Sequence, residues 1–417
     1  MKNTSRPHVV IIGGGFGGVQ TFRNLHRFIH HKRGAHVTLI DQRNYFLFYP
    51  MLHEMATGTV SRTHLTQPIR EMLHCCHARF MRATVKKVDR KRRIIHTDDG
   101  PVRYDYCVVA VGSRPNDFGV PGVAEHAFAL RSVEDCARLR NRIIYCFEEA
   151  SREHREGRRA IWLSFVIVGG GPTGVELAGQ LGDLINREMR ALYPLAFDHV
   201  APRITIVESA ERILGRHSDY FTNQAGRALK KMGVEIMVNT RVTKVEKDKI
   251  HLANNDHIGA CTVIWTSGVQ SNADQIFTAA ELDERSRIPV DAYLRMKDDP
   301  RVFALGDAAT IHDPGLGFVP QTAQAAVHES RTLAQNIKRT VLGRVLAPYR
   351  YHSPGDLVPI GDWFAIAQLG PVRFTGRIAW LLRRLVFLFT MYDWGDRARI
   401  ALDWTLNMFT FRDTSEL

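Results

Sequence analysis

The sequence predicts an α/β protein in which one domain architecture occurs twice in tandem, followed by an amphipathic helical region. The pattern G-x-G-x-x-G follows an apolar run at two places, in VVIIGGGFGG at residues 9–18 and in FVIVGGGPTG at residues 165–174. A later apolar run ends in a glycine in each half, at Gly112 and at Gly268. Each of these glycines lies 99 residues after the first glycine of its loop (112 − 13 and 268 − 169). Equal spacing in both halves indicates a duplicated fold.

The spacing within each loop has a physical meaning. The first glycine permits a tight turn out of a strand, the second lets the backbone approach a pyrophosphate, and the third lets the next helix pack closely on the sheet. The N-terminus of that helix then faces the phosphates. The chain therefore contains two Rossmann-like loops that each predict a bound dinucleotide: Gly13, Gly15 and Gly18, and then Gly169, Gly171 and Gly174.

An acidic residue is expected at the end of the second strand of each domain, where it bonds the ribose hydroxyls. The segment AHVTLID supplies Asp41 after the first loop, and PRITIVE supplies Glu208 after the second. Glu208 favours NADH over NADPH because a carboxylate repels a 2′-phosphate. Arg212 lies close to Glu208 in the sequence and leaves NADPH open as an alternative.

The chain returns to the first domain after the second one. The apolar run VFAL leads into Gly306 and Asp307, where a carboxylate can approach the sugar-alcohol and pyrophosphate of a flavin dinucleotide. A helix expected from about Thr322 would direct its positive end at the flavin ring and stabilise the reduced state. A plain helix cap is the alternative reading of GDAA.

Domain boundaries follow from these segments. We expect one dinucleotide-binding domain over residues 1–115 and 280–345, a second over 116–279, and a C-terminal region over 346–417. The Pro/Gly-rich segment 113–122 is expected to be a linker, residues 132–150 a helix, and residues 151–159 a polar loop.

Composition narrows the choice of partners. The 417 residues are 45% hydrophobic and 24% charged, which is typical of a globular protein, and the net charge is +13. Such a charge attracts nucleic acid or an anionic membrane, but the basic residues are scattered and form no nucleic-acid motif, so we expect no nucleic-acid partner. The six cysteines show neither C-x-x-C nor zinc spacing. We therefore expect no metal and a reducing compartment, with Cys107 and Cys261 buried and the adjacent Cys75 and Cys76 unpaired with each other.

The C-terminal region contains two amphipathic patterns. On a helix over 377–392, three arginines fall within one arc (Arg377, Arg383 and Arg384), and large apolar side chains such as Trp380 cover the rest. A second helix is expected near 397–411, with Trp404 among its apolar residues. No apolar run reaches the roughly eighteen residues that a membrane span requires. We expect residues 376–411 to lie on a membrane surface; a homodimer interface, or a helix pair packed on the core, is the alternative.

Seven segments together resemble the type II NADH:quinone oxidoreductases, which are single-subunit, non-pumping NADH dehydrogenases. The resemblance spans essentially the whole chain, and its markers are VVIIGGGFGG, LIDQRNYFLFYPMLHEMATG, CVVAVGSRPNDFGVPGV, VIVGGGPTGVELAG, VIWTSGV, FALGDAA and PQTAQAAVH. The last of these is similar to the A-Q-x-A-x-Q quinone-site helix of that family.

The resemblance implies roles for individual residues. The first loop with Asp41 would hold the adenosine half of FAD, and four further residues would line the rest of that site: Ala110, Gly112, Gly306 and Asp307. The second loop with Glu208 would bind NADH. Glu176 matches a glutamate near the nicotinamide and the flavin, and Gln324 matches the first glutamine of the quinone motif. Two residues depart from the family pattern, because His328 replaces the second glutamine and Tyr49 replaces a frequent glutamine. These departures put the identity of the acceptor in doubt.

The implied activity is hydride transfer from NADH to flavin, followed by electron transfer to a quinone of the ubiquinone or menaquinone type. The resemblance also implies a peripheral position on the cytoplasmic side of the inner (plasma) membrane. A sulfide:quinone reductase shares the fold but needs a cysteine pair beside the flavin. The non-enzymatic alternative is a redox sensor and interaction protein that binds flavin and NADH.

Overall fold

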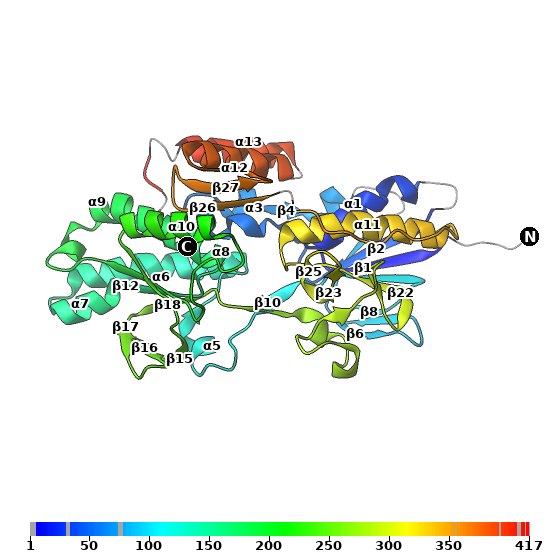
Figure 1. Cartoon of the computed structure of the whole chain (residues 1–417), viewed down its shortest axis with the longest axis horizontal. Coiled ribbons are helices and arrows are strands. Elements are labelled where there is room, and N and C mark those ends of the chain that lie inside the picture. Colours follow the sequence, from blue (N-terminus) through cyan, green and yellow to red (C-terminus); the bar gives the residue numbers. More distant parts are fainter. Residues whose placement is uncertain are drawn as a thin grey trace, which may run out of the picture. The chain divides into compact units, whose positions relative to one another are not determined.

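The computed structural model describes residues 6–30, 34–73, 78–353, 355–391, 393–406, 410–412 and 414–416. Cys75 and Cys76 lie outside these residues. The chain groups into two compact units (Figure 1), each described below by itself. The first comprises Met1–Leu47, Thr66–Arg114 and Val269–Ser353, and the second comprises Phe48–Leu65, Pro115–Gly268 and Pro354–Leu417.

A six-stranded sheet of order β21-β22-β9-β1-β2-β5 organises the first unit. All neighbouring strands are parallel except the antiparallel pair β21 and β22. The central strand β1 is apolar and buried from Val9 to Ile12, as expected of a strand covered on both faces. The sheet consists of β1 (His8–Ile12), β2 (His36–Asp41), β5 (Ala78–Arg82), β9 (Tyr106–Val109), β21 (Arg295–Met296) and β22 (Asp299–Ala304).

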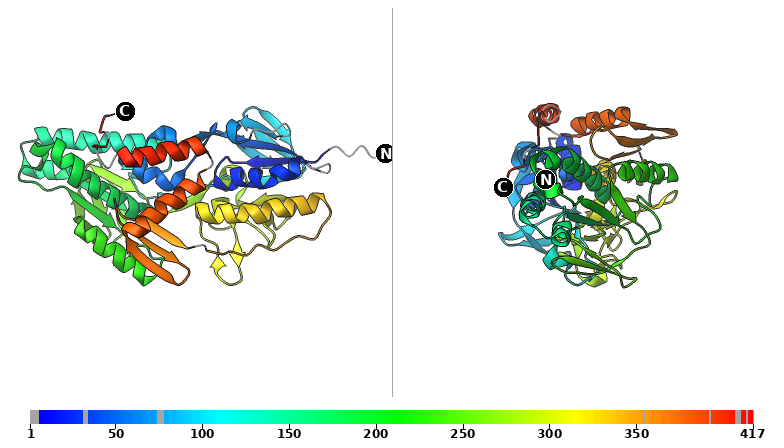
Figure 2. Two further views of the ribbon diagram at one scale, coloured as in Figure 1. Left: turned by 90° about the horizontal axis from the view of Figure 1, so that it is seen from above. Right: turned by 90° about the vertical axis from the view of Figure 1, so that its left-hand side faces the viewer.

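Two long helices of the first unit lie side by side, α1 (Phe16–Ile29) and α11 (Ala323–Val341), as Figures 1 and 2 show. The unit also has an antiparallel meander of β6 (Val85–Asp89), β7 (Ile94–Thr97) and β8 (Gly100–Arg103). Its shorter elements are β3 (Tyr45–Leu47), β4 (Thr66–Pro68), α4 (Ile69–Met72), β19 (Val269–Ser271), η4 (Asn272–Gln275), η5 (Ala279–Glu281), β20 (Ile288–Pro289), η6 (Gly306–Ala308), β23 (Ala309–Thr310), β24 (His312–Asp313) and β25 (Gly317–Phe318).

The second unit repeats this plan with a five-stranded parallel sheet of order β11-β18-β12-β13-β14. Side chains alternate across the central strand. Val166 and Val168 pack in the apolar cluster that includes the meander, whereas Phe165, on the other face, stacks on Phe147 of a helix. The strands are β11 (Ala127–Phe128), β12 (Ser164–Val168), β13 (Arg203–Val207), β14 (Val234–Met237) and β18 (Thr262–Trp265), with the meander β15 (Val242–Val245), β16 (Lys249–Leu252) and β17 (His257–Gly259).

The main helices of the second unit are α6 (Val133–Arg152), α8 (Pro172–Leu184) and α10 (Asp219–Lys231). Its shorter helical segments are η1 (Tyr49–Met51), α2 (Leu52–Ala56), α3 (Arg62–Leu65), α5 (Val123–His126), α7 (Glu156–Trp162), η2 (Ile185–Met189), α9 (Arg190–Leu192) and η3 (Pro194–Phe197). The helix expected over 132–150 corresponds to α6, which Ser132 caps by accepting a hydrogen bond from the Asp135 N–H.

The polar loop expected over 151–159 is wrong, because α6 continues to Arg152 and α7 begins at Glu156. Arg159 is buried within α7, where its guanidinium donates to the backbone carbonyls of Glu153 and Asp198. A charged sequence therefore forms a helix here because carbonyl oxygens satisfy its buried arginine.

The tail packs into the second unit as a small sheet followed by two helices. The strands are β26 (Asp356–Pro359), β27 (Ala365–Leu369) and β28 (Val372–Gly376), and the helices are α12 (Arg377–Thr390) and α13 (Trp394–Leu406). The expected helix over 377–392 thus ends at Thr390, and the second begins at Trp394. Residues 407–409 of the second expected helix, which include Asn407 and Phe409, lie outside the described residues. Residues 48–65, which the sequence boundaries assigned to the first domain, group with the second unit because α2 contacts α6 and α8.

The arginines of α12 were expected to form an exposed polar edge, and this expectation is wrong for Arg383 and Arg384. Arg383 and Arg384 are 2% and 9% exposed, and Trp380 and Trp404, expected among the outward apolar side chains, are each 4% exposed. The Arg384 guanidinium lies 3.6 Å from the ring centre of Trp380 and 4.5 Å from that of Trp404. Burial lowers the pKa of Arg384 to about 10. Two of the three arginines, Arg383 and Arg384, therefore face the protein interior, where they contact aromatic rings and a carboxylate, whereas Arg377 is exposed.

The opposite face of the tail helices is apolar and exposed. Its large side chains are Ile378, Leu381, Leu385, Val386, Phe389, Trp394, Leu402 and Leu406. Within the described residues, no helix is both long enough and apolar enough to cross a bilayer.

Candidate functional site

The first glycine loop joins β1 to α1, and each of its glycines meets a different steric demand. Gly13 has a φ of +108°, and a Cβ there would lie 2.2 Å from the carbonyl oxygen of Ala110. A Cβ on Gly18 would lie 1.8 Å from the carbonyl oxygen of Gly13. Gly15 has no heavy atom within 4 Å of the same position. The loop is closed by backbone at its ends and open in its middle, which fits a phosphate approaching the N-terminus of α1.

The second loop, between β12 and α8, has the same geometry. Gly169 has a φ of +111°, with Ser267 backbone atoms 2.9 Å from an added Cβ. A Cβ on Gly174 would lie 2.0 Å from the carbonyl oxygen of Gly169, whereas Gly171 again has nothing within 4 Å. Pro172 then begins α8 without requiring a backbone N–H. Both loops therefore fit a dinucleotide pyrophosphate.

The acidic residues after the second strands make equivalent contacts in the two units. Asp41 Oδ2 accepts a hydrogen bond of 2.6 Å from the Gly14 N–H, and Glu208 Oε2 accepts one of 2.6 Å from the Gly170 N–H. Each carboxylate thus braces the middle of its glycine loop. Arg212, which left NADPH open, forms an ion pair with Asp219.

Polar contacts connect the residues that are expected to line the rest of the first unit's dinucleotide site, beyond its glycine loop. Gly112 and Gly306 have φ of +65° and +64°, and Ala110 is buried. Asp307 accepts a hydrogen bond of 2.5 Å from the Ser113 hydroxyl. The Gly306 N–H donates to Glu329 Oε2 at 2.6 Å.

Glu329 is a residue that the sequence analysis did not single out. It lies on α11 and is 1% exposed, and burial raises its pKa to about 8, with the Asp307 charge acting in the same direction. A lone glutamate among the apolar positions of an amphipathic helix was the available signal. Its bond to Gly306 ties α11 to the segment that carries Asp307.

Gln324 and His328 lie one turn apart on α11, so both are on one side of the helix. Thr322 caps the helix by accepting a hydrogen bond from the Ala325 N–H. Gln324 is exposed and His328 is half-buried. Burial, together with the charges of Arg331 and His352, lowers the pKa of His328. The imidazole is therefore neutral at neutral pH and offers one ring N–H to a ligand.

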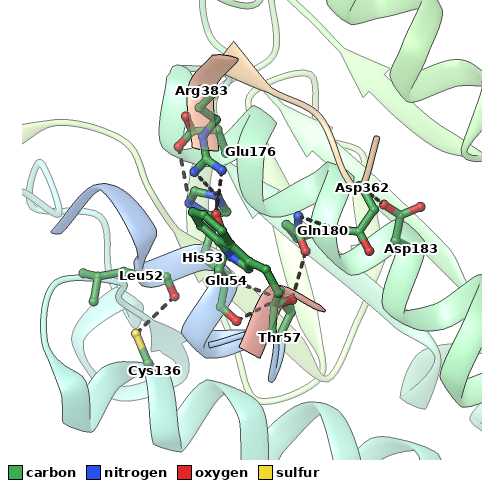
Figure 3. A network of polar contacts seen from close by, with 12 residues as sticks. Leu52, His53, Glu54, Thr57, Cys136, Glu176, Gln180, Asp183, Asp362 and Arg383 are labelled. Carbon is green, nitrogen blue, oxygen red and sulfur yellow. Dashed lines mark hydrogen bonds and ion pairs between the residues drawn. The ribbon is translucent and has the colours of Figure 1, made fainter. Parts of the chain in front are cut away.

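Glu176 lies on α8, close after the second loop, and its side chain is 15% exposed. Burial raises its pKa to about 8; the Arg383 charge opposes this rise and the Glu54 charge adds to it. Glu176 Oε2 lies 3.4 Å from Nδ1 of His53, a contact that Figure 3 displays. A carboxyl group in this state holds a proton at neutral pH and releases it in mild base.

The cysteines that the structure describes are all buried and form no disulfide: Cys107, Cys136, Cys146 and Cys261. The expected burial of Cys107 and Cys261 is confirmed, and burial raises the pKa of both thiols. Within the described residues, no cluster of histidine, cysteine or acidic side chains could hold a metal ion.

The fold and the paired loops define a two-dinucleotide oxidoreductase, and the chain belongs to the pyridine nucleotide-disulphide oxidoreductase family, whose model matches residues 7–330. Within that family it is a member of the type II NADH:quinone oxidoreductases. It is 30% identical to such an enzyme of Mycobacterium tuberculosis over 98% of this chain and 89% of the relative. The resemblance found in the sequence is thereby confirmed.

Other comparisons agree with this assignment. A demethylphylloquinone reductase of Synechocystis is 29% identical over 96% of both chains. The solved structure of NDH2 from Plasmodium falciparum in complex with NADH has the same fold, with a TM-score of 0.89 at 20% identity, and the match covers 99% of this chain and 100% of that one. The sulfide:quinone oxidoreductase of Aquifex aeolicus is more distant, with a TM-score of 0.74 at 19% identity over 97% and 95% of the chains. A pyridine nucleotide and a flavin-type cofactor follow from the family.

Proposed function

We propose that this protein oxidises NADH and reduces a membrane quinone, with FAD as its resident cofactor and without pumping protons. The observation that carries the proposal is the pair of loops in which only Gly15 and Gly171 are open to an approaching phosphate. Family membership supports the reaction class, since the relative from Mycobacterium tuberculosis carries the name of that reaction.

FAD is assigned to the first domain, residues 1–115 and 280–345. The loop of Gly13, Gly15 and Gly18 would take its pyrophosphate, and Asp41 would take its adenosine ribose. The remaining contacts are assigned to Ala110, Gly112, Gly306 and Asp307. A bound flavin supplies the capacity to accept a hydride and pass electrons on.

NADH is assigned to the second domain, residues 116–279. The loop of Gly169, Gly171 and Gly174 would take the pyrophosphate, and Glu208 would bond the ribose hydroxyls. Two features support NADH over NADPH. Glu208 repels a 2′-phosphate, and the Arg212 charge is paired with Asp219. Glu176 would hold or release a proton beside the nicotinamide and the flavin.

The quinone is assigned to the side of α11 that carries Gln324 and His328. Each side chain offers an N–H to a quinone carbonyl oxygen, and neutral His328 donates without adding charge. Substitution of histidine for the family glutamine preserves a donor at this position. A quinone of the ubiquinone or menaquinone type is the expected acceptor.

The apolar face of α12 and α13 is assigned to a membrane surface, with the protein peripheral on the cytoplasmic side of the inner (plasma) membrane. Its exposed side chains include Ile378, Phe389 and Trp394, and the net charge of +13 favours an anionic surface. A homodimer formed through the same face is the competing outcome.

Flavin spectroscopy of the purified full-length protein tests this proposal. NADH should bleach the oxidised flavin absorbance, and a soluble quinone should restore it over many turnovers. A colourless protein would refute the proposal. Slow turnover with a stable reduced complex would instead support a redox sensor, and bleaching by sulfide but not by NADH would support a sulfide:quinone reductase.

A further inference from the structure

The inner face of α12 carries Arg383 into a buried polar cluster on α2 (Figure 3). Arg383, His53 and Glu54 are each 2% exposed. Arg383 Nη1 donates to Glu54 Oε1 at 2.6 Å, and Nη2 lies 3.4 Å from His53 Nε2. The Trp404 indole on α13 donates to the other Glu54 oxygen at 2.9 Å. Both tail helices therefore reach the segment that contacts Glu176.

The chemistry of the guanidinium determines the tautomer of His53. An arginine side chain has only donors, so His53 Nε2 must be the acceptor in this contact. The alternative partner of Nε2 is Glu54 Oε1, but it lies 3.8 Å away, too far for a hydrogen bond. The ring proton therefore resides on Nδ1, which is the atom 3.4 Å from Glu176 Oε2.

His53 keeps this tautomer because it does not take up a second proton. Burial and the Arg383 charge lower the pKa of His53 to about 3. Burial acts to raise the pKa of Glu54, but the Arg383 charge, its hydrogen bond and the other positive groups nearby, among them Arg384, together outweigh burial and bring that pKa to about 2. The pair of Arg383 and Glu54 is thus ionised around a neutral imidazole over the working pH range.

We propose that Arg383 is a positioning residue for Glu176: it fixes His53 as the Nδ1–H tautomer, and that N–H orients the Glu176 carboxyl group through Oε2. When Glu176 is protonated, its proton then resides on Oε1, the oxygen that His53 does not engage. The inference rests on the proposed function for the role of Glu176, but the tautomer itself does not depend on it.

The titratable and charged groups that face Glu176 from the packed elements are the neutral His53 and the ionised Glu54 on α2 and Arg383 on α12. Asp183 lies farther along α8 and accepts the backbone N–H of Asp362. A ring N–H whose nitrogen lies 3.4 Å from a carboxylate oxygen stabilises the ionised form, so we expect loss of the His53 donor to raise the pKa of Glu176 further.

The tautomer is measured directly by nitrogen-15 NMR of the full-length protein labelled at histidine. Loss of one ring signal in His53→Gln assigns the residue. We expect wild-type His53 to have a protonated Nδ1 and an unprotonated Nε2. The double variant Arg383→Met with Glu54→Gln removes both buried charges together and should abolish the single tautomer. A wild-type signal with the proton on Nε2 would overturn the inference.

The pH profile of kcat/KM for NADH gives the functional readout. We expect a limb near pH 8 that Glu176→Gln removes, and His53→Leu should shift this limb upward by about one pH unit. His53→Gln keeps a donor and an acceptor and should restore the wild-type position. Arg377→Met is the matched control, because Arg377 lies on the same helix but is exposed.

An unshifted limb in His53→Leu would overturn the positioning role, even if that variant lost activity or thermal stability. If the wild-type protein failed to reduce quinone at all, the proposed function would fail while the NMR measurement still decided the tautomer. The two failures are therefore distinguishable.

Discussion

Arg412 places its guanidinium Nε 3.5 Å from a carboxylate oxygen of Glu188, a side chain with no exposed surface. Glu188 lies in the π-helical segment that continues α8. Among the described residues, neither of its oxygens accepts a hydrogen bond. Arg412 also donates to Asp362 at 2.8 Å. The end of the tail is thereby fastened to the second unit by a buried charge pair.

We predict that Arg412→Ala destabilises the protein by about 3 kcal/mol, because it removes the nearer of the two arginines that pair with the buried Glu188 and leaves only Arg187, whose Nε lies 3.8 Å from Oε1. Burial already raises the pKa of Glu188, and the Arg412 charge opposes that rise. A carboxyl with a raised folded-state pKa stabilises the fold below its unfolded pKa and loses this contribution as pH rises through the folded pKa. The Arg412→Ala defect should therefore grow with pH in thermal melts. Adding Glu188→Gln should recover stability in base, and a defect that does not vary with pH would contradict this account.

The glycine loops predict a graded response to alanine. Gly171→Ala adds a methyl group to open space and should leave the fold and flavin content intact while raising the KM for NADH about tenfold or more, because that space is assigned to the pyrophosphate. Gly174→Ala forces a methyl group to within 2.0 Å of the Gly169 carbonyl oxygen and should impair folding itself. Steady-state kinetics and thermal melts separate the two effects. Equal KM values of Gly171→Ala and the wild type for NADH would show that the second loop does not bind NADH.

Nucleotide choice should depend on how Arg212 is paired. Asp219 is largely exposed, so Asp219→Asn should preserve the fold and free the Arg212 guanidinium for a 2′-phosphate. We expect roughly a tenfold gain in kcat/KM for NADPH, about 1.4 kcal/mol, with little change for NADH. Glu208→Gln should lower kcat/KM for NADH and thereby reduce the preference for NADH over NADPH. A wild-type enzyme that prefers NADPH would contradict the assignment of Glu208.

Membrane binding should depend on the outward face of the tail helices. The triple variant Ile378→Gln, Phe389→Gln and Trp394→Gln removes exposed apolar surface without touching the inward arginines. It should lose most of its co-sedimentation with anionic liposomes while keeping NADH oxidation by a soluble quinone. Val345→Gln, at a position 86% exposed in the first unit, is the control. A variant that still sediments, or one that only converts a dimer to a monomer, would point away from the membrane.

Much of the fold was predictable because its signals are local in the sequence. A glycine loop between an apolar run and a helix reports its own geometry, so Gly13 and Gly169 could be identified with no knowledge of their neighbours. The helix expected from about Thr322 likewise begins there, with Thr322 as its N-cap. The residue roles at these sites remain predictions.

The orientation of the tail could not be predicted, because a helical pattern defines two faces but not which of them is buried. The deciding partner of Arg383 is Glu54, which lies 329 residues away in the sequence. Glu54 gave no signal of its own, since a glutamate between His53 and Met55 in a short helix is unremarkable until its burial is known. Long-range charge pairing thus overrode the usual expectation that arginines face solvent.

The outward apolar face of α12 and α13 also affects colloidal stability. Because this apolar face is exposed in the folded protein, two molecules in dilute solution associate when their apolar faces meet. Mutual repulsion from the net charge of +13 opposes that adhesion at low ionic strength. Added salt screens the repulsion while leaving the adhesion intact. The protein should therefore stay in solution best at low salt or with detergent covering the apolar face. Turbidity should rise with salt concentration.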